Sequence, residues 1–113
     1  MKTQLLSAAM LLALAACNQS ATEKKADAIE ENANVTADAI RDNAEVRADA
    51  LENKADAVES QGDHMTPAGE AKSDAAAASM QTEADRIRAQ AETTADHVEA
   101  KGSDKADAVR DQK

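Results

Sequence analysis

Aromatic residues are missing from the whole chain: its 113 residues include no Phe, Tyr or Trp. Proline occurs once and glycine three times. Aromatic and large aliphatic side chains supply most of the burial energy of a globular core, and the large aliphatic residues are few. A compact globular domain is therefore excluded, and the choice lies between long helices and disorder. The abundance of Ala, Glu, Lys, Arg and Gln favours helices.

The motifs of enzymes and cofactor-binding proteins are also missing. The sequence has no glycine-rich phosphate loop, no zinc-ligand spacing and no nucleophile elbow. His64 stands beside Met65 without a second His or a carboxylate cluster at ligand spacing, so we assign it to a linker. The acidic residues recur with a helical period, which is typical of a solvated face. We therefore expect no enzymatic activity, cofactor, metal ion or small-molecule substrate.

Acidic residues outnumber basic ones by 22 to 13, which gives a net charge of -9. The sequence shows no basic stripe and no aromatic stacking platform, so nucleic acid is not an expected partner. Anionic lipid headgroups would repel so acidic a chain. Any attachment to a membrane must then depend on a lipid anchor.

The amino terminus contains the longest apolar run. Lys2 precedes an uncharged stretch from Leu5 to Ala16 that only Ser7 interrupts. A spanning helix needs about 20 apolar residues, and this stretch is shorter. A charged start, a short apolar middle and small residues at the end are typical of a secretory signal peptide. We assign residues 1–16 to such a signal.

The single cysteine follows this run directly, in Leu14-Ala15-Ala16-Cys17. This motif resembles the lipobox of bacterial lipoproteins. The resemblance implies cleavage before Cys17, acyl chains such as palmitate on Cys17, and residues 17–22 as a tether. A lone exported cysteine has no disulfide partner in its own chain, and two or three acyl chains anchor a protein stably. In such lipoproteins, an Asp directly after the cysteine resembles the signal that retains the protein on the inner membrane. This chain has Asn18 and Gln19 there instead. We therefore expect the periplasmic side of the outer membrane in a Gram-negative cell.

The mature chain contains an 11-residue repeat. We predict a first helical segment at 23–61, with Ser20 and Glu23 at capping-box spacing and Thr22 as an alternative cap. An apolar stripe with helical spacing runs along one face of this segment; its members are Ala26, Ile29, Ala33, Ala37, Ile40, Ala44, Ala48, Leu51, Ala55 and Val58. A thinner second stripe suggests a further neighbour; it contains Ala28, Val35, Ala39, Val46 and Ala50.

Residues 62–69 interrupt the repeat. Gly62 suits the position just past a helix end, Thr66 suits an N-cap, and Pro67 suits the first helical position. So short a connection usually joins antiparallel neighbours. We predict a Gly/Pro linker between two helical arms.

The second helical segment, 70–113, repeats the pattern of the first. Its stripe reads Met80, Ala84, Ile87, Ala91, Ala95, Val98, Gly102, Ala106 and Val109. Gly102 either permits a close approach of the partner helix or weakens the last turns. His97 marks the edge of the stripe. Ion pairs between residues three apart are expected for Asp38–Arg41, Glu83–Arg86, Asp85–Arg88 and Asp107–Arg110.

These observations predict an all-α fold of two long Ala-rich helices, either a hairpin or an extended coiled-coil-like rod. The alternative is a solvated helix without a packing partner, partly disordered. Because Ala-rich stripes bury little area, a single hairpin is marginally stable by itself, and we expect its helicity to depend on self-association or on crowding near the membrane.

Two families resemble the mature part. The lipidated Cys17, the Ala-rich rod and the terminal Lys113 are similar in plan to the major murein lipoprotein, in which the terminal Lys is joined to peptidoglycan. Residues 26–58 and 84–110 resemble the 11-residue repeats of group 3 late-embryogenesis-abundant proteins. The first resemblance implies a structural spacer of the cell envelope, with Lys113 as the attachment point. The second implies a stress-protective polypeptide without a fixed partner.

Overall fold

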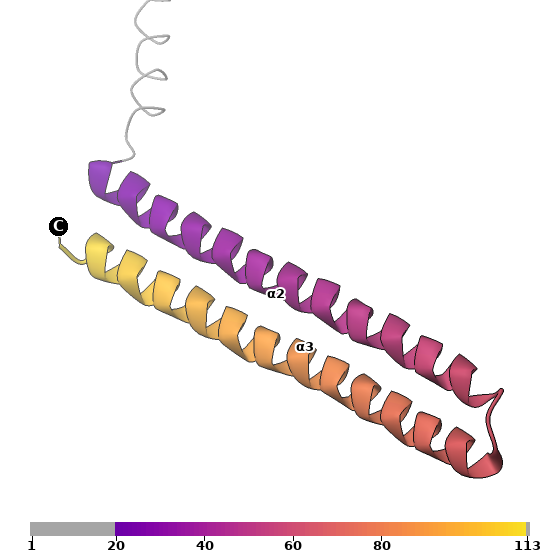
Figure 1. Ribbon diagram of the computed structural model, residues 1–113. Helices are drawn as coiled ribbons and strands as arrows, with labels where there is room; N and C mark the ends of the chain where they lie inside the picture. The colour runs from indigo at the N-terminus through magenta and orange to yellow at the C-terminus, as the bar shows by residue number, and fades with distance from the viewer. Residues whose placement is uncertain (1–19, 113) are drawn as a thin grey trace, which may run out of the picture.

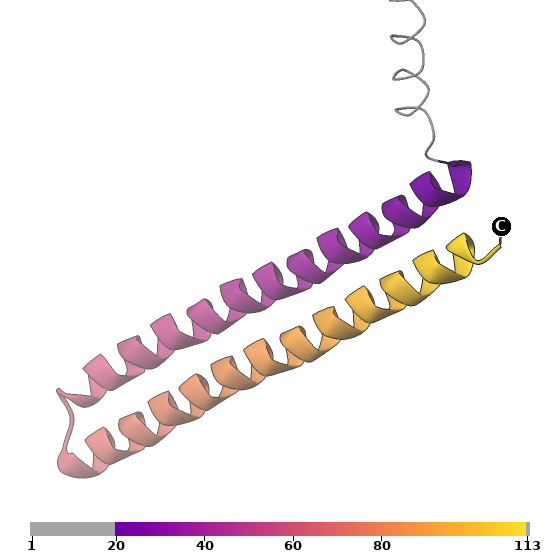
Figure 2. The ribbon, with the colours of Figure 1, turned by 180° about the vertical axis from the view of Figure 1, so that it is seen from behind.

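The computed structural model describes residues 20–112, and the secondary structure of these residues is entirely helical. Helix α2 spans Ala21–Gly62 and helix α3 spans Pro67–Arg110. The two helices lie side by side and antiparallel, so the end of α3 lies next to the start of α2 (Figures 1 and 2). The predicted all-α fold of two long helices is confirmed, and the hairpin is the arrangement adopted. The predicted signal peptide 1–16, Cys17 and Lys113 lie outside the described residues.

Both helices begin with a side-chain cap. The Ser20 hydroxyl accepts a hydrogen bond from the Glu23 amide at 3.2 Å. The Thr66 hydroxyl accepts from the Gly69 amide at 3.4 Å, and Pro67 occupies the first helical position. Each cap satisfies an amide that has no carbonyl partner within the helix. Because Ser20 is the cap, α2 begins at Ala21, two residues before the predicted start of the segment at 23.

The connection is shorter than the predicted linker 62–69. Helix α2 continues through Gly62, and only residues 63–66 separate it from α3. Gly62 does not have a positive φ, so the expected role just past a helix end is wrong. Gly62 is instead buried, and a Cβ on it would lie 2.6 Å from the Ser73 Cβ. Close contact between the arms therefore accounts for this glycine.

The main apolar stripe of each helix forms the interface between the helices. Every residue of these two stripes is buried or half-buried, whereas the thinner second stripe of α2 is exposed. Alanines such as Ala26, Ala37 and Ala84 have no exposed surface and occupy the middle of the contact. Larger side chains such as Ile40 and Val98 are half-buried at its edge. Small residues let the two backbones approach closely, and the larger ones close the sides of the interface.

Gly102 lies at a close approach of the two helices. A Cβ added there would overlap the Cβ of Ala33 and would lie 3.8 Å from the Ile29 carbonyl oxygen. Of the two roles expected for this glycine, close approach is therefore the one the structure supports. Within the described residues, neither helix contains an apolar stretch long enough to cross a membrane.

Candidate functional site

Three arginines form ion-pair networks along one side of the helix interface. Arg88 of α3 reaches three carboxylates of α2: its Nε lies 3.0 Å from Glu45, its Nη2 3.1 Å from Asp49, and its Nη1 2.5 Å from Glu52. Only 29% of the Arg88 side chain is exposed. A planar guanidinium is suited to several carboxylates at once because its five N–H donors point in fixed directions. We call each such group an arginine cluster.

The other two clusters have the same construction. Arg41 of α2 donates to carboxylates of α3, at 3.0 Å, 3.2 Å and 2.7 Å; they belong to Glu92, Asp96 and Glu99. Arg110 of α3 donates to carboxylates near the start of α2, at 3.4 Å, 3.1 Å and 2.8 Å; they belong to Glu23, Asp27 and Glu30. Each cluster thus joins one arginine to acids at positions i, i+4 and i+7 of the facing helix.

The clusters determine the register of the hairpin. The i, i+4 and i+7 positions place the three acids on one face of a helix, where a single guanidinium reaches all of them. Arg41 and Arg88 are 47 residues apart, and so are the acids Glu45 and Glu92. The two central clusters are therefore related by a pseudo-twofold axis. Sliding one helix along the other would leave an arginine beside the wrong residues, so the charge pattern favours this one register.

Hydrogen bonds within the clusters shift the pKa values of their members. Hydrogen bonding to Arg110 lowers the pKa of Glu30, and hydrogen bonding to Arg88 lowers the pKa of Glu52. Hydrogen bonding to Arg41 lowers the pKa of Glu92 in the same way. The bonds to these carboxylates raise the pKa of each of the three arginines. Both partners of each pair consequently remain charged near neutral pH.

The sequence predicts only the local part of these clusters. The expected pairs between residues three apart are present: Asp38–Arg41 at 3.6 Å, Glu83–Arg86 at 2.5 Å, Asp85–Arg88 at 3.9 Å and Asp107–Arg110 at 3.1 Å. The pairs between helices were missed. Their signal is the recurrence of Glu-x3-Asp-x2-Glu at 23–30, 45–52 and 92–99. The three cluster arginines in turn each directly follow an Ala-Asp-x-Ile/Val motif, at 37–40, 84–87 and 106–109.

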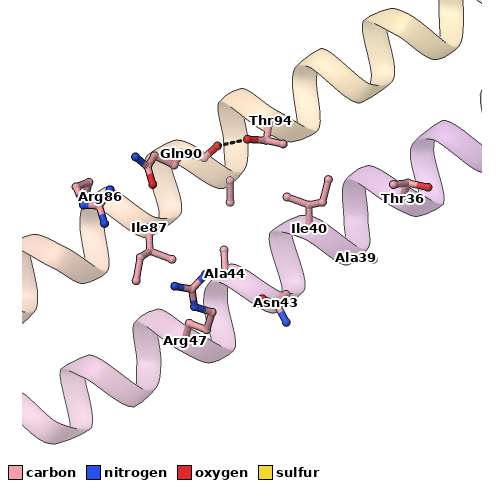
Figure 3. Close-up of a pocket in the computed structure, with 11 residues that line it drawn as sticks. Thr36, Ala39, Ile40, Asn43, Ala44, Arg47, Arg86, Ile87, Gln90 and Thr94 are labelled. Atoms are coloured by element: carbon pink, nitrogen blue, oxygen red, sulfur yellow. Dashed lines mark hydrogen bonds between the residues drawn. The ribbon is translucent and has the colours of Figure 1, made fainter.

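The opposite side of the helix interface is a shallow groove. Its central hollow has a volume of about 510 Å³, and Ile40 and Ile87 face it from the two helices (Figure 3). Arg47 and Arg86 also line this hollow. A second hollow of about 450 Å³ lies between Ile29 and Val98, and a third contains Leu51 and Met80. We call these three hollows together the groove face.

Basic residues gather on the groove face. The charged residues that line its three hollows are Arg47, Arg86, Lys101, Lys105 and one acid, Glu83. Glu83 is bound to Arg86 of its own helix. The hairpin therefore separates its charges, with carboxylates around the arginine clusters on one side and cations around half-buried aliphatic side chains on the other. The sequence shows no basic stripe because these cations come from both arms of the hairpin, Arg47 from α2 and the others from α3.

A third surface is formed by the exposed valines of α2. Val35 and Val46 are 61% and 69% exposed, although large apolar side chains are usually covered. Each follows a stripe alanine by two residues, about 200° around the helix, so both face away from α3. Within the described residues of one chain, nothing covers them. The second neighbour that the thinner stripe suggested is not supplied by the hairpin.

The described residues contain no group of three or more His, Cys, Asp or Glu side chains arranged to hold a metal ion. His64 lies in the connecting turn and His97 on an exposed position of α3. Cys17 and Lys113, the two predicted modification sites, are outside the described residues. Comparisons with protein-family models, curated proteins and solved structures found no match for this chain.

Proposed function

We propose that the protein is a small, acidic, lipid-anchored spacer of the bacterial cell envelope. The observation that carries this proposal is the lipobox-like motif Leu14-Ala15-Ala16-Cys17 at the end of a short apolar run. A cleaved and acylated Cys17 stands only three residues before the Ser20 cap of α2. The anchor is then joined to a long helix with almost no intervening chain.

The hairpin gives the spacer a definite length. A helix of 44 residues extends about 66 Å at 1.5 Å per residue. The start of α2 is the end nearest the anchor, so the turn at residues 63–66 is the point farthest along the helices from it. The spacer has no catalytic part in this proposal, and the three arginine clusters serve to keep the two arms together.

Attachment of Lys113 to peptidoglycan stays a prediction and is not part of the proposed spacer. Arg110 pairs with Glu23, so the end of α3 returns to the end of the hairpin nearest Cys17. A link through Lys113 would then place the cell wall next to the membrane-anchored end of the hairpin. It would not keep the cell wall one hairpin length away from the membrane. Digestion of the cell wall with muramidase, followed by mass spectrometry of the C-terminal peptide, tests this link.

Intact mass of the protein extracted from native membranes tests the anchor. The proposal predicts the mass of residues 17–113 plus two or three acyl chains. The matched control is Cys17→Ser, which has no thiol to acylate and therefore keeps residues 1–16. An unmodified mature chain in the soluble fraction would contradict the proposal. In a Gram-negative host, Asn18→Asp should move the protein from the outer to the inner membrane on a density gradient.

The alternative proposal is a stress-protective polypeptide that is disordered in dilute solution. The two proposals differ in the circular dichroism of the unlipidated chain at low concentration. Arginine clusters within one chain predict a helical spectrum that does not depend on concentration. A coil spectrum that becomes helical only on drying would favour the stress-protective protein.

A further inference from the structure

The groove face and the exposed valines of α2 are the two surfaces that the hairpin leaves open. We propose that they bind each other between copies of this chain, so that α2 of one copy lies along the groove face of the next. The outer valine face, defined as Val35 and Val46 with Ala28 and Ala50, supplies the apolar contact. The proposal does not depend on lipid attachment at Cys17.

Charge complementarity favours a second copy as the occupant. The cations Arg47, Lys101 and Lys105 line the groove face and form no ion pair within 4 Å among the described residues. One turn before and after each valine the charged residues are acidic: Glu31 lies one turn before Val35 and Asp42 one turn before Val46. Lys24 and Lys54 lie one turn beyond Ala28 and Ala50, at the two ends of the outer valine face. Two groove faces would repel each other because each carries the same excess of positive charge. A groove face and an outer valine face attract each other.

The spacing of apolar side chains also agrees between the two surfaces. Val35 and Val46 are 11 residues apart, and so are Ile29 and Ile40 on one wall of the groove. Ile87 and Val98 on the other wall have the same separation. An interval of 11 residues is about 16.5 Å along a helix. Both valines therefore meet equivalent hollows at the same time, between Ile40 and Ile87 and between Ile29 and Val98.

When two copies bind through these two different surfaces, one copy still has a free groove face and the other still has a free outer valine face. Such a contact is heterologous, and it builds rings or open chains instead of stopping at a symmetric dimer. This property separates the proposal from ordinary helix-bundle dimerisation, in which both copies use the same surface. It also permits a test by complementation.

The test compares two variants by sedimentation velocity. Full-length protein, processed by its producing cell, is extracted in enough mild detergent to leave one chain per micelle. The first variant, Val35→Gln with Val46→Gln, removes the apolar contact, adds no charge and keeps good helix formers. The second, Arg47→Glu with Lys101→Glu, reverses the groove charge without touching the arginine clusters. A matched control, Thr93→Gln with His97→Gln, makes two neutral substitutions on exposed positions of α3 outside the groove face.

We expect the parent and the α3 control to form species larger than a dimer as concentration rises, while each variant alone stays monomeric. An equimolar mixture of the two variants should form a dimer with one copy of each and nothing larger, since only one intact contact is possible. Circular dichroism should show the same helix content in all four proteins. A monomeric parent, variants that associate like the parent, or a mixture that remains monomeric would each overturn the proposal.

Discussion

The contact between Gly102 and Ala33 allows a quantitative test of how closely the two helices approach. In an isolated helix, Gly102→Ala should stabilise the protein by about 1 kcal/mol because alanine is the better helix former. In the hairpin, the new methyl group would overlap the Ala33 Cβ, which has no flexible chain that can move aside. Overpacking of this kind costs about 1–3 kcal/mol. The expected net change is therefore a loss of about 0–2 kcal/mol.

A double-mutant cycle separates the overlap from helix propensity. Ala33→Gly should cost about 1 kcal/mol by propensity alone, and Ala33→Gly with Gly102→Ala should return close to parent stability because the methyl group merely changes helices. The coupling energy of the cycle should equal the overlap, about 1–3 kcal/mol. Urea unfolding followed by circular dichroism measures all four proteins.

The sign of the stability change caused by Gly102→Ala shows whether the two helices approach closely at this residue. A Gly102→Ala variant that is more stable than the parent by about 1 kcal/mol, which is about 4–8 °C in Tm for a protein of this size, would refute the close approach. Ser103→Ala is the control, because it changes a neighbouring exposed position of α3 and so reports helix propensity without an overlap. We expect Ser103→Ala to be neutral or stabilising.

Three further predictions concern the ion pairs and the caps. Arg88→Gln should lower the urea midpoint more than Arg86→Gln. Arg88 pairs with three carboxylates of the other helix, whereas Arg86 pairs with Glu83 of its own helix. Equal shifts of the midpoint would mean that the arginine clusters do not stabilise the hairpin. The pKa of Glu52 in the folded protein lies below its usual 4.5, so the Glu52 carboxylate stabilises the fold above that pH, and this stability is lost as the pH falls through the lowered pKa. Glu52→Gln should therefore reduce the difference between the urea midpoints at pH 7 and pH 3. An unchanged difference would contradict the ion pair between Glu52 and Arg88. Thr66→Ala should cost about 1 kcal/mol in urea unfolding through loss of the α3 cap, whereas Thr66→Ser should cost little.

Local and periodic features of the hairpin could be predicted from the sequence. The 11-residue repeat identified the buried face of each helix, because burial follows the same period as the backbone. Capping chemistry identified Ser20, Thr66 and Pro67 for the same reason, since each acts within a few residues. The stripe of α3 was nonetheless read too short: Ser73 and Ala77 continue it and are also buried.

Features that depend on the register between the arms could not be predicted in this way. Pairing Arg88 with Glu45, Asp49 and Glu52 requires knowing how far one helix is shifted along the other, and neither the repeat nor the caps give that shift. The same limit concealed the groove face, whose cations come from distant parts of the chain. Gly62 was misread because burial against Ser73, and not its own φ, explains the residue.

The distance between the two ends of the hairpin tests the central claim most directly. Spin labels at Ser20→Cys and Gln112→Cys, in a chain with Cys17→Ser and diluted with unlabelled protein, report this distance by pulsed dipolar spectroscopy. Neighbouring antiparallel helices have axes about 8–10 Å apart, so the hairpin predicts a short distance that dominates the distribution. A continuous rod of the same residues would separate the labels by about 140 Å at 1.5 Å per residue, beyond the range of the method. Loss of the short distance would contradict the hairpin, and with it the register that the arginine clusters define.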